Sequence, residues 1–284
     1  MPELKLSVVD KVSLINSKDF ADLYFKPQRP LVIEDFAKSW PAIEKWTPEF
    51  FKSQHGSKQV KVYDDGFVKA GKQYMGKLKS VPLSEYVDIV ISSSRNLRMF
   101  LYNIKSEIPE LVDDIVFPNF VSGISKKFVF MFFGCKDSIT QMHFDIDMSH
   151  VFHTTMHGKK TIYLFPYDQA KNLYHHPFTC RSYVDVEHPD FDKFPALEKL
   201  QGYLVTLNPG ETLYMPSGYW HHILYDEPSY SISLRCPSET WQGKLLGLYN
   251  LLVMSPIDRL MNMISPQGWF NWKQQQAFKV NQTL

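Results

Sequence analysis

The sequence predicts a mainly β fold, a double-stranded β-helix (jelly roll) with N-terminal α/β elements and C-terminal helices. Many short apolar runs of strand length alternate with Gly, Pro and Asp turn residues, as is typical of a double-sheet jelly roll. The chain has 284 residues, of which 44% are hydrophobic and 15% aromatic, enough for one large core. No repeat, low-complexity tract or Gly/Ser linker divides it.

We therefore expect one domain over residues 1–240, followed by a helical extension over residues 241–284. Within the domain, an N-terminal α/β part covers about residues 1–120 and the jelly-roll core about residues 121–240. In the first part the sequence predicts a strand at 30–33, a helix that starts at Pro48, and a helix over 83–91. The later strands are predicted at 97–104, 127–133, 160–165, 203–207, 212–215 and 230–234.

After Pro237 the apolar residues recur at helical spacing on either side of Pro256, which predicts two amphipathic helices. The apolar positions are Trp241, Leu245, Leu248 and Leu252 before that proline, and Ile257, Leu260, Met261 and Ile264 after it. These helices either cap the core of the domain or form a surface for a homodimer. The sequence leaves both possibilities open.

Composition disfavours several functional classes, and it makes nucleic acid an unlikely but not an excluded partner. The formal net charge is +1, so the overall field does not draw the protein toward nucleic acid or an anionic membrane. The cysteines Cys135, Cys180 and Cys236 lack CxxC spacing, which disfavours a disulfide framework and a cysteine zinc module. The first residues lack the apolar segment of a secretory signal, and no stretch is long enough to span a bilayer. These features predict a cytoplasmic protein that acts on a peptide, a protein or a small molecule.

Two short motifs predict a metal site. His143 and Asp145 are two residues apart in a strand-like segment, so their side chains project from one face. A third ligand can come from another strand, and Tyr219-Trp220-His221-His222 offers it at His221. Two imidazoles and one carboxylate leave three open positions on an octahedral ion, the pattern of non-haem Fe(II) oxygenases. By strand alternation, His222 points away from this site.

Three sequence blocks carry a resemblance to a known family. Residues 140–145, 158–166 and 210–221 resemble the JmjC or cupin-like oxygenases, most nearly the subfamily of the factor-inhibiting-HIF type of asparaginyl hydroxylase. The resemblance covers roughly residues 30–237. It implies Fe(II), 2-oxoglutarate as co-substrate and O2, with succinate and CO2 as co-products. It also implies that His143, Asp145 and His221 are the iron ligands.

The same resemblance assigns residues to the co-substrate. Lys160 matches the family lysine that pairs with the far carboxylate of 2-oxoglutarate, and Thr140 matches its hydroxyl partner. Tyr102 is a further candidate donor, although the strand register can present Phe100 instead. Arg235 can compete for the same carboxylate, orient Asp145, bind substrate, or form a structural ion pair.

The chain also departs from these relatives. Between Asp145 and Gly158 it holds two additional residues, and in this segment we expect His153 to enter the cavity. Ser182 and Pro237 stand where the asparaginyl hydroxylases carry the glutamine and tryptophan that clasp their target, so asparagine specificity is not implied.

The predicted function is thus a 2-oxoglutarate-dependent dioxygenase that hydroxylates a protein side chain or a small molecule. Two alternatives stay open. One is a metal-dependent cupin without 2-oxoglutarate, acting as an isomerase or hydrolase, and the other is a non-catalytic binding module. The sequence does not distinguish hydroxylation from demethylation, because the two outcomes differ only in which carbon is hydroxylated.

Overall fold

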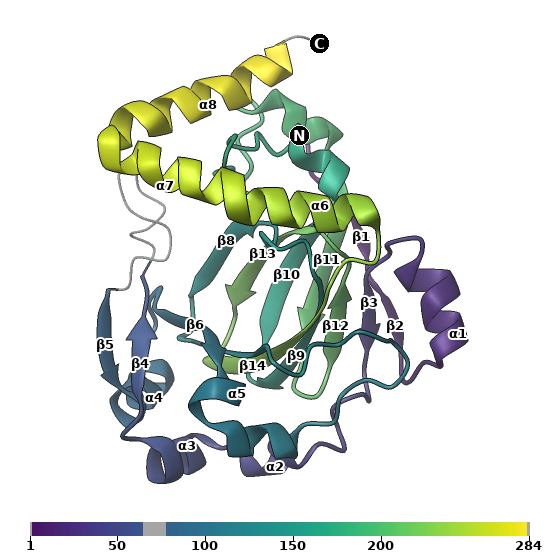
Figure 1. The fold of residues 1–284 in the computed structure, drawn as a ribbon, viewed down its shortest axis with the longest axis vertical. Coiled ribbons are helices and arrows are strands. Elements are labelled where there is room, and N and C mark those ends of the chain that lie inside the picture. Colours follow the sequence, from purple (N-terminus) through teal and green to yellow (C-terminus); the bar gives the residue numbers. More distant parts are fainter. Residues whose placement is uncertain (1, 65–77, 283–284) are drawn as a thin grey trace.

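A computed structural model describes residues 2–64 and 78–282 of the chain (Figure 1). Two facing β-sheets form a barrel-like core, and long C-terminal helices lie across one end of it. The helices and the small hairpin of the N-terminal part lie outside the barrel. The jelly-roll prediction is confirmed.

The two sheets have five and seven strands. In spatial order, the five-stranded sheet contains β1 (Lys5–Val8), β11 (Gln201–Leu207), β10 (Lys160–Phe165), β13 (Trp220–Tyr225) and β8 (Ile139–His143). The seven-stranded sheet contains β2 (Asp10–Val12), β3 (Leu31–Ile33), β12 (Thr212–Met215), β9 (His150–His157), β14 (Ser229–Cys236), β7 (Val129–Gly134) and β6 (Arg98–Asn103). The chain crosses between the sheets at β8–β9, β9–β10 and at each step from β11 to β14, which closes the core.

The N-terminal part packs on the core through aromatic side chains. It contains α1 (Ser17–Phe20), η1 (Ala21–Phe25), α2 (Pro41–Lys45), α3 (Pro48–His55), β4 (Gln59–Val62), β5 (Lys79–Pro82), α4 (Leu83–Ser92), α5 (Ile104–Glu107) and η3 (Pro109–Asp114). Helix α3 starts as predicted, with Pro48 in its first turn and the Thr47 hydroxyl accepting the Phe50 N–H. Its Phe51 ring lies 5.3 Å from that of Phe133, which anchors the helix to β7.

The C-terminal extension differs from the two predicted helices. A continuous helical run passes through Pro256 as α6 (Trp241–Tyr249), the π-helical η6 (Asn250–Met254) and α7 (Ser255–Ile264), and α8 (Pro266–Gln282) follows it (Figure 1). The wide π turn, in which the Ser255 N–H bonds to the Asn250 carbonyl, places Pro256 in the first turn of α7. Pro256 has no N–H to donate within this run, and the π turn is the local departure from α-helical geometry beside it. None of the described helices is both long and apolar enough to cross a membrane.

Candidate metal centre and its cavities

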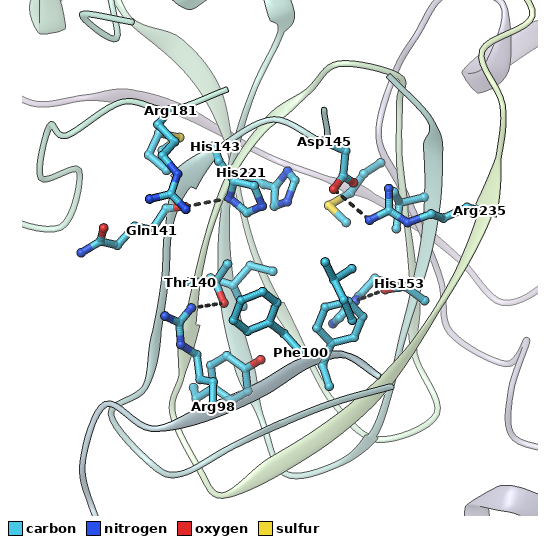
Figure 2. A pocket seen from close by; sticks show the side chains of 18 of the residues that line it. Arg98, Phe100, Thr140, Gln141, His143, Asp145, His153, Arg181, His221 and Arg235 are labelled. Carbon is cyan, nitrogen blue, oxygen red and sulfur yellow. Dashed lines mark hydrogen bonds and ion pairs between the residues drawn. The ribbon is translucent and has the colours of Figure 1, made fainter. Parts of the chain in front are cut away.

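Three predicted ligands meet where β8 and β13 lie side by side. His143 ends β8 and is the cross-strand neighbour of His221 on β13, with ring centroids 4.2 Å apart. Asp145 lies two residues beyond the end of β8 and turns toward the same point (Figure 2). The possible ligand atoms of these three residues all lie within 4.8 Å of one another, so one ion can contact all three.

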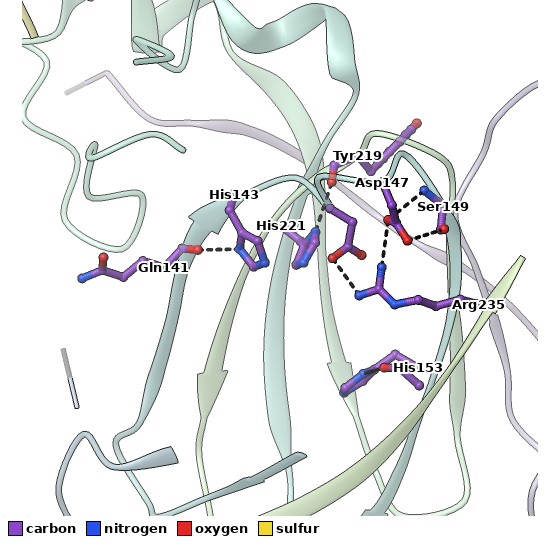
Figure 3. Close-up of polar contacts among 10 residues, drawn as sticks. Gln141, His143, Asp147, Ser149, His153, Tyr219, His221 and Arg235 are labelled. Carbon is purple, nitrogen blue, oxygen red and sulfur yellow. Dashed lines mark hydrogen bonds and ion pairs between the residues drawn. The ribbon is translucent and has the colours of Figure 1, made fainter. Parts of the chain in front are cut away.

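Backbone contacts fix both imidazoles in the form that binds a metal. Nδ1 of His143 lies 2.8 Å from the Gln141 carbonyl oxygen, and Nδ1 of His221 lies 3.1 Å from that of Tyr219 (Figure 3). A carbonyl only accepts, so each Nδ1 carries the proton and each Nε2 keeps its lone pair. Burial lowers the pKa of both rings, and their mutual proximity adds to this for His143. Both rings are therefore neutral near pH 7.

Arg235 holds the carboxylate of the triad. Its guanidinium lies 2.9 Å from Asp145 Oδ1 and 3.0 Å from Asp147 Oδ1 (Figure 3). Burial alone would raise the pKa of Asp145, but the charge of Arg235 and the two nearby imidazoles lower it from 3.8 to about 2. Two neutral imidazoles and one ionised carboxylate are a fitting donor set for Fe(II).

Asp147 was not singled out in the sequence. It lies in the turn between β8 and β9, within the segment that holds the two additional residues, and it accepts bonds from Ser149 N and Oγ at 3.3 and 2.8 Å. These bonds orient Asp147 so that it shares Arg235 with Asp145. The structure thus places Arg235 beside the predicted ligand Asp145, and orienting Asp145 was one of the roles expected for it.

The triad opens into an inner cavity of about 80 Å³ inside the barrel. One buried water needs roughly 10–15 Å³, so this cavity has room for a small molecule. His143, Asp145 and His221 lie at one end of it, and Arg98, Phe100 and Thr140 lie at the other (Figure 2). Arg98 Nη1 donates to Thr140 Oγ1 at 3.0 Å. Sequence reasoning found Thr140 but missed Arg98.

Strand β6 presents Phe100 rather than Tyr102 to this cavity. Strict alternation would place Arg98, Phe100 and Tyr102 on one face. The pairing of β6 with β7 shifts between Met99 and Tyr102, and Leu101 has a φ of 53°. This bulge brings Phe100 and Leu101 to the cavity, while Tyr102 is not among its lining residues. The structure therefore favours Phe100, the alternative register, over Tyr102.

Lys160 is fully buried beside the cavity, but it is not one of the residues that line it. Its Nζ donates to Ser231 Oγ at 2.6 Å and lies 4.2 Å from the centre of the Tyr225 ring. Tyr225 is its cross-strand partner and does line the cavity. Among the described residues, no carboxylate is within ion-pair distance of Lys160.

Two further histidines lie near the triad and differ in orientation. His153 on β9 lines the inner cavity as expected, with Nδ1 2.8 Å from Ser233 Oγ. His222 points away from His221, as strand alternation predicts, and its Nε2 lies 2.8 Å from Glu187 Oε1. His222 is thus a packed histidine on the opposite face of β13.

An outer cavity of about 730 Å³ lies between the mouth of the barrel and the C-terminal helices. It shares His143, Asp145 and Arg181 with the inner cavity, and α7 and α8 contribute Asp258, Phe270 and Lys273 to its wall. Asp258 on α7 accepts bonds from Trp269 Nε1 at 2.7 Å and Lys273 Nζ at 2.5 Å, which tie α7 to α8. The helical extension is therefore part of the chamber in front of the triad.

Comparison with known proteins identifies a matching family and several relatives. Residues 17–236 match the family described as Cupin-like domain. The chain is 27% identical over 238 residues to Lysine-specific demethylase 8 of Xenopus tropicalis, covering 80% of this chain and 52% of that protein. It is 28% identical over 238 residues to Lysine-specific demethylase JMJ30 of Arabidopsis thaliana, covering 79% and 54%. The human Bifunctional peptidase and (3S)-lysyl hydroxylase JMJD7 is 23% identical over 234 residues, covering 69% and 73%.

The chain spans about half the length of the first two relatives. The family match covers the barrel except β1 and β2 and most of the N-terminal part, and it includes all three residues of the triad. The resemblance to JmjC and cupin-like proteins is thereby confirmed, whereas none of these three relatives is named an asparaginyl hydroxylase. This chain belongs to the Cupin-like domain family, in its JmjC group.

Proposed function

We propose that this protein is an Fe(II)- and 2-oxoglutarate-dependent oxygenase that hydroxylates its substrate. The observation that carries the proposal is the triad itself. Two neutral imidazoles, each with an unprotonated Nε2, and one ionised carboxylate converge at one end of the inner cavity. This arrangement leaves one side of an octahedral ion for other ligands, as catalytic rather than structural sites do.

In this proposal His143, Asp145 and His221 hold the iron. 2-Oxoglutarate would bind beside these residues, with the inner cavity to hold its chain. Thr140 and Arg98 line the far end of that cavity, and Lys160 is buried beside it. The family resemblance assigns the far carboxylate of 2-oxoglutarate to Lys160 and Thr140.

Bound Fe(II), with 2-oxoglutarate and O2, supplies oxidative decarboxylation to succinate and CO2 coupled to insertion of one oxygen atom into a C–H bond. The protein supplies the geometry of the site. The carbonyls of Gln141 and Tyr219 fix the two rings, and Arg235 fixes the carboxylate of Asp145. The apolar side chains of Val151, Met215 and Ile223 line the inner cavity and limit the water it can hold.

The primary substrate reaches the iron through the outer cavity. Its volume of about 730 Å³ and its mixed aromatic and charged wall suit a protein side chain or a small molecule. The names of the relatives, lysine-specific demethylases and a lysyl hydroxylase, support a lysine-containing protein as the first substrate to test. Hydroxylation of an N-methyl carbon would release formaldehyde, whereas hydroxylation of a ring or chain carbon would leave a stable product.

The direct test is reconstitution with Fe(II), 2-oxoglutarate and O2, in which succinate and oxygen consumption are followed together. We expect the intact protein to form succinate, faster when the true substrate is present, and Asp145→Ala to form none. A protein that takes Zn(II) and yields no succinate under any condition would instead be a metal-dependent cupin without a co-substrate. Failure to bind any divalent metal would identify a non-catalytic module.

A further inference from the structure

The inner and outer cavities meet at the triad, and a small set of residues forms the boundary between them. The described residues that line both cavities are Leu101, His143, Asp145, Arg181 and Arg235. Among these five, Leu101 is the only one with an apolar side chain. A substrate that approaches the triad from the outer cavity crosses this boundary, and its apolar contact there is Leu101.

The four polar members of the boundary are fixed by the site itself (Figure 2). His143 and Asp145 are two of the three predicted ligands. Arg235 is held by its ion pairs of 2.9 and 3.0 Å at the metal end, and the backbone of Arg181 pairs with that of His143. Leu101 is therefore the member of the boundary whose size can change without altering a ligand or an ion pair.

Leu101 reaches the boundary because of the bulge in β6. The pairing of β6 with β7 contains one extra residue on β6 between Met99 and Tyr102. In a regular strand, neighbouring side chains point to opposite faces, but at this bulge two successive residues, Phe100 and Leu101, both line the inner cavity.

The backbone at this position favours glycine rather than leucine. Leu101 has a φ of 53°, in the left-handed region that residues with a Cβ rarely adopt. It is only partly buried, and it belongs to none of the three hydrophobic clusters formed by the described residues. Core packing thus gives no reason for a leucine here, and strained residues of this kind concentrate at functional sites.

We propose that Leu101 determines substrate specificity by setting the width of the passage from the outer cavity to the metal. Its side chain contacts the substrate next to the reacting carbon, so a slender unbranched chain passes more readily than a branched or aromatic group. This inference rests on the proposed function, because it takes the triad as the metal site and the outer cavity as the route of the substrate.

The test compares two probes that bind a metal through the same imidazole nitrogen but differ in width, imidazole and 4-phenylimidazole. Stopped-flow absorption of the Co(II)-loaded protein, whose visible spectrum changes when a nitrogen ligand binds, gives the association rate constant of each probe. We expect wild type to bind 4-phenylimidazole roughly 10-fold more slowly than imidazole, the scale on which a pocket discriminates by a methylene group.

Variants of Leu101 should change this ratio in both directions. Leu101→Ala should raise the rate constant for 4-phenylimidazole roughly 10-fold and that for imidazole by less than about twofold, whereas Leu101→Phe should slow the wider probe further. Leu101→Gly should open the passage as Leu101→Ala does. It should also unfold at a higher denaturant concentration than Leu101→Ala, because glycine tolerates the positive φ.

Leu251→Ala is the matched control, since Leu251 lines the outer cavity but not the inner one. It should leave the ratio of the two rate constants unchanged. An equal change in Leu251→Ala and Leu101→Ala would overturn the inference, and so would a wild type that binds both probes at the same rate. A folded wild type that binds no Co(II) would instead contradict the proposed function, a result seen before any probe is added.

Discussion

At the scale of single residues, the proposed metal site depends on groups other than its three candidate ligands. Arg235 bridges Asp145 and Asp147, so the one anionic candidate ligand is held by a cation that is itself held by a second carboxylate. This arrangement keeps Asp145 ionised in spite of its burial. Partners of metal ligands commonly matter almost as much as the ligands.

Replacing Arg235 by methionine should therefore weaken metal binding. The variant leaves Asp145 without its charged partner, and we expect the dissociation constant for Mn(II) or Zn(II) to rise about 10- to 100-fold. Calorimetry on the metal-free protein measures it. Glu187→Gln is the control, since it changes the contact of His222 on the other face of β13. Equal affinity in wild type and Arg235→Met would refute this role of Arg235.

At the scale of elements, the strands were largely predictable, because their apolar runs are bounded by turn residues. The predicted strands at 160–165 and 212–215 coincide with β10 and β12, and the others differ by at most two residues at either end. Strands β1, β2, β4 and β5 were missed. β1 and β2 are short and mostly exposed, and they lie at the sheet edges.

The candidate site was predictable to the extent that strand alternation holds. The two-residue alternation of a strand and the motif resemblance together predict the triad, Thr140 and the outward direction of His222. The bulge at Leu101 does not follow from a period of two, so the sequence left both Tyr102 and Phe100 open and could not choose Phe100. Arg98 was overlooked. Asp147 was missed because an aspartate in a turn ordinarily serves the turn itself.

The turn from β9 to β10 offers a test of the fold at this scale. Gly158 has a φ of 72°, and a Cβ placed there would lie 2.2 Å from the Pro228 carbonyl oxygen. Backbone strain and overlap together should make Gly158→Ala less stable by about 2–4 kcal/mol. Denaturant unfolding measures the loss.

Gly210→Ala provides the comparison. Gly210 also has a positive φ, 87°, but its added Cβ would meet only the Lys38 side chain at 3.4 Å. It should lose only about 1–2 kcal/mol. Equal losses in the two variants would show that overlap with Pro228 plays no part.

At the scale of the whole molecule, the C-terminal helices have one face toward the outer cavity and one toward solvent. One face walls the outer cavity. The other leaves apolar side chains in solvent along α6, η6 and α7, including Trp241 at 73% exposure and Leu252 at 65%. A group of exposed apolar side chains of this kind often marks an interface.

We propose that this face forms a homodimer, and light scattering coupled to size-exclusion chromatography tests it. Leu252→Glu should convert the dimer to monomer without lowering the melting temperature, because the side chain is exposed in the single chain. Leu23→Glu, which changes an exposed leucine on η1, should leave the dimer intact. A wild-type protein that is monomeric at every concentration would contradict the proposal.

Acid should destabilise the whole fold through its buried histidines. Burial lowers the pKa of His150 to about 4 and that of His176 to about 3. The unfolded chain, with a histidine pKa near 6.5, then binds more protons than the folded one below that pH. Stability is therefore complete above about pH 6.5 and falls toward pH 4, by at most about 1.4 kcal/mol per pH unit for each group.

Urea unfolding of the metal-free protein between about pH 7.5 and pH 5 measures this slope. His176→Phe is a suitable comparison, because the ring of His176 packs against those of Tyr183 and Phe270. The variant should show a smaller slope than wild type. An unchanged slope would mean that His176 does not contribute to the acid sensitivity.

The most direct test of the central claim is optical titration of the Fe(II) protein with 2-oxoglutarate in the absence of oxygen. A 2-oxo acid that chelates Fe(II) through its carboxylate and keto oxygens produces a visible charge-transfer band. We predict this band for the intact protein and its absence in Asp145→Ala and His221→Ala. An iron-loaded wild type that shows no band at saturating 2-oxoglutarate, or variants that keep it, would contradict a co-substrate bound at this triad.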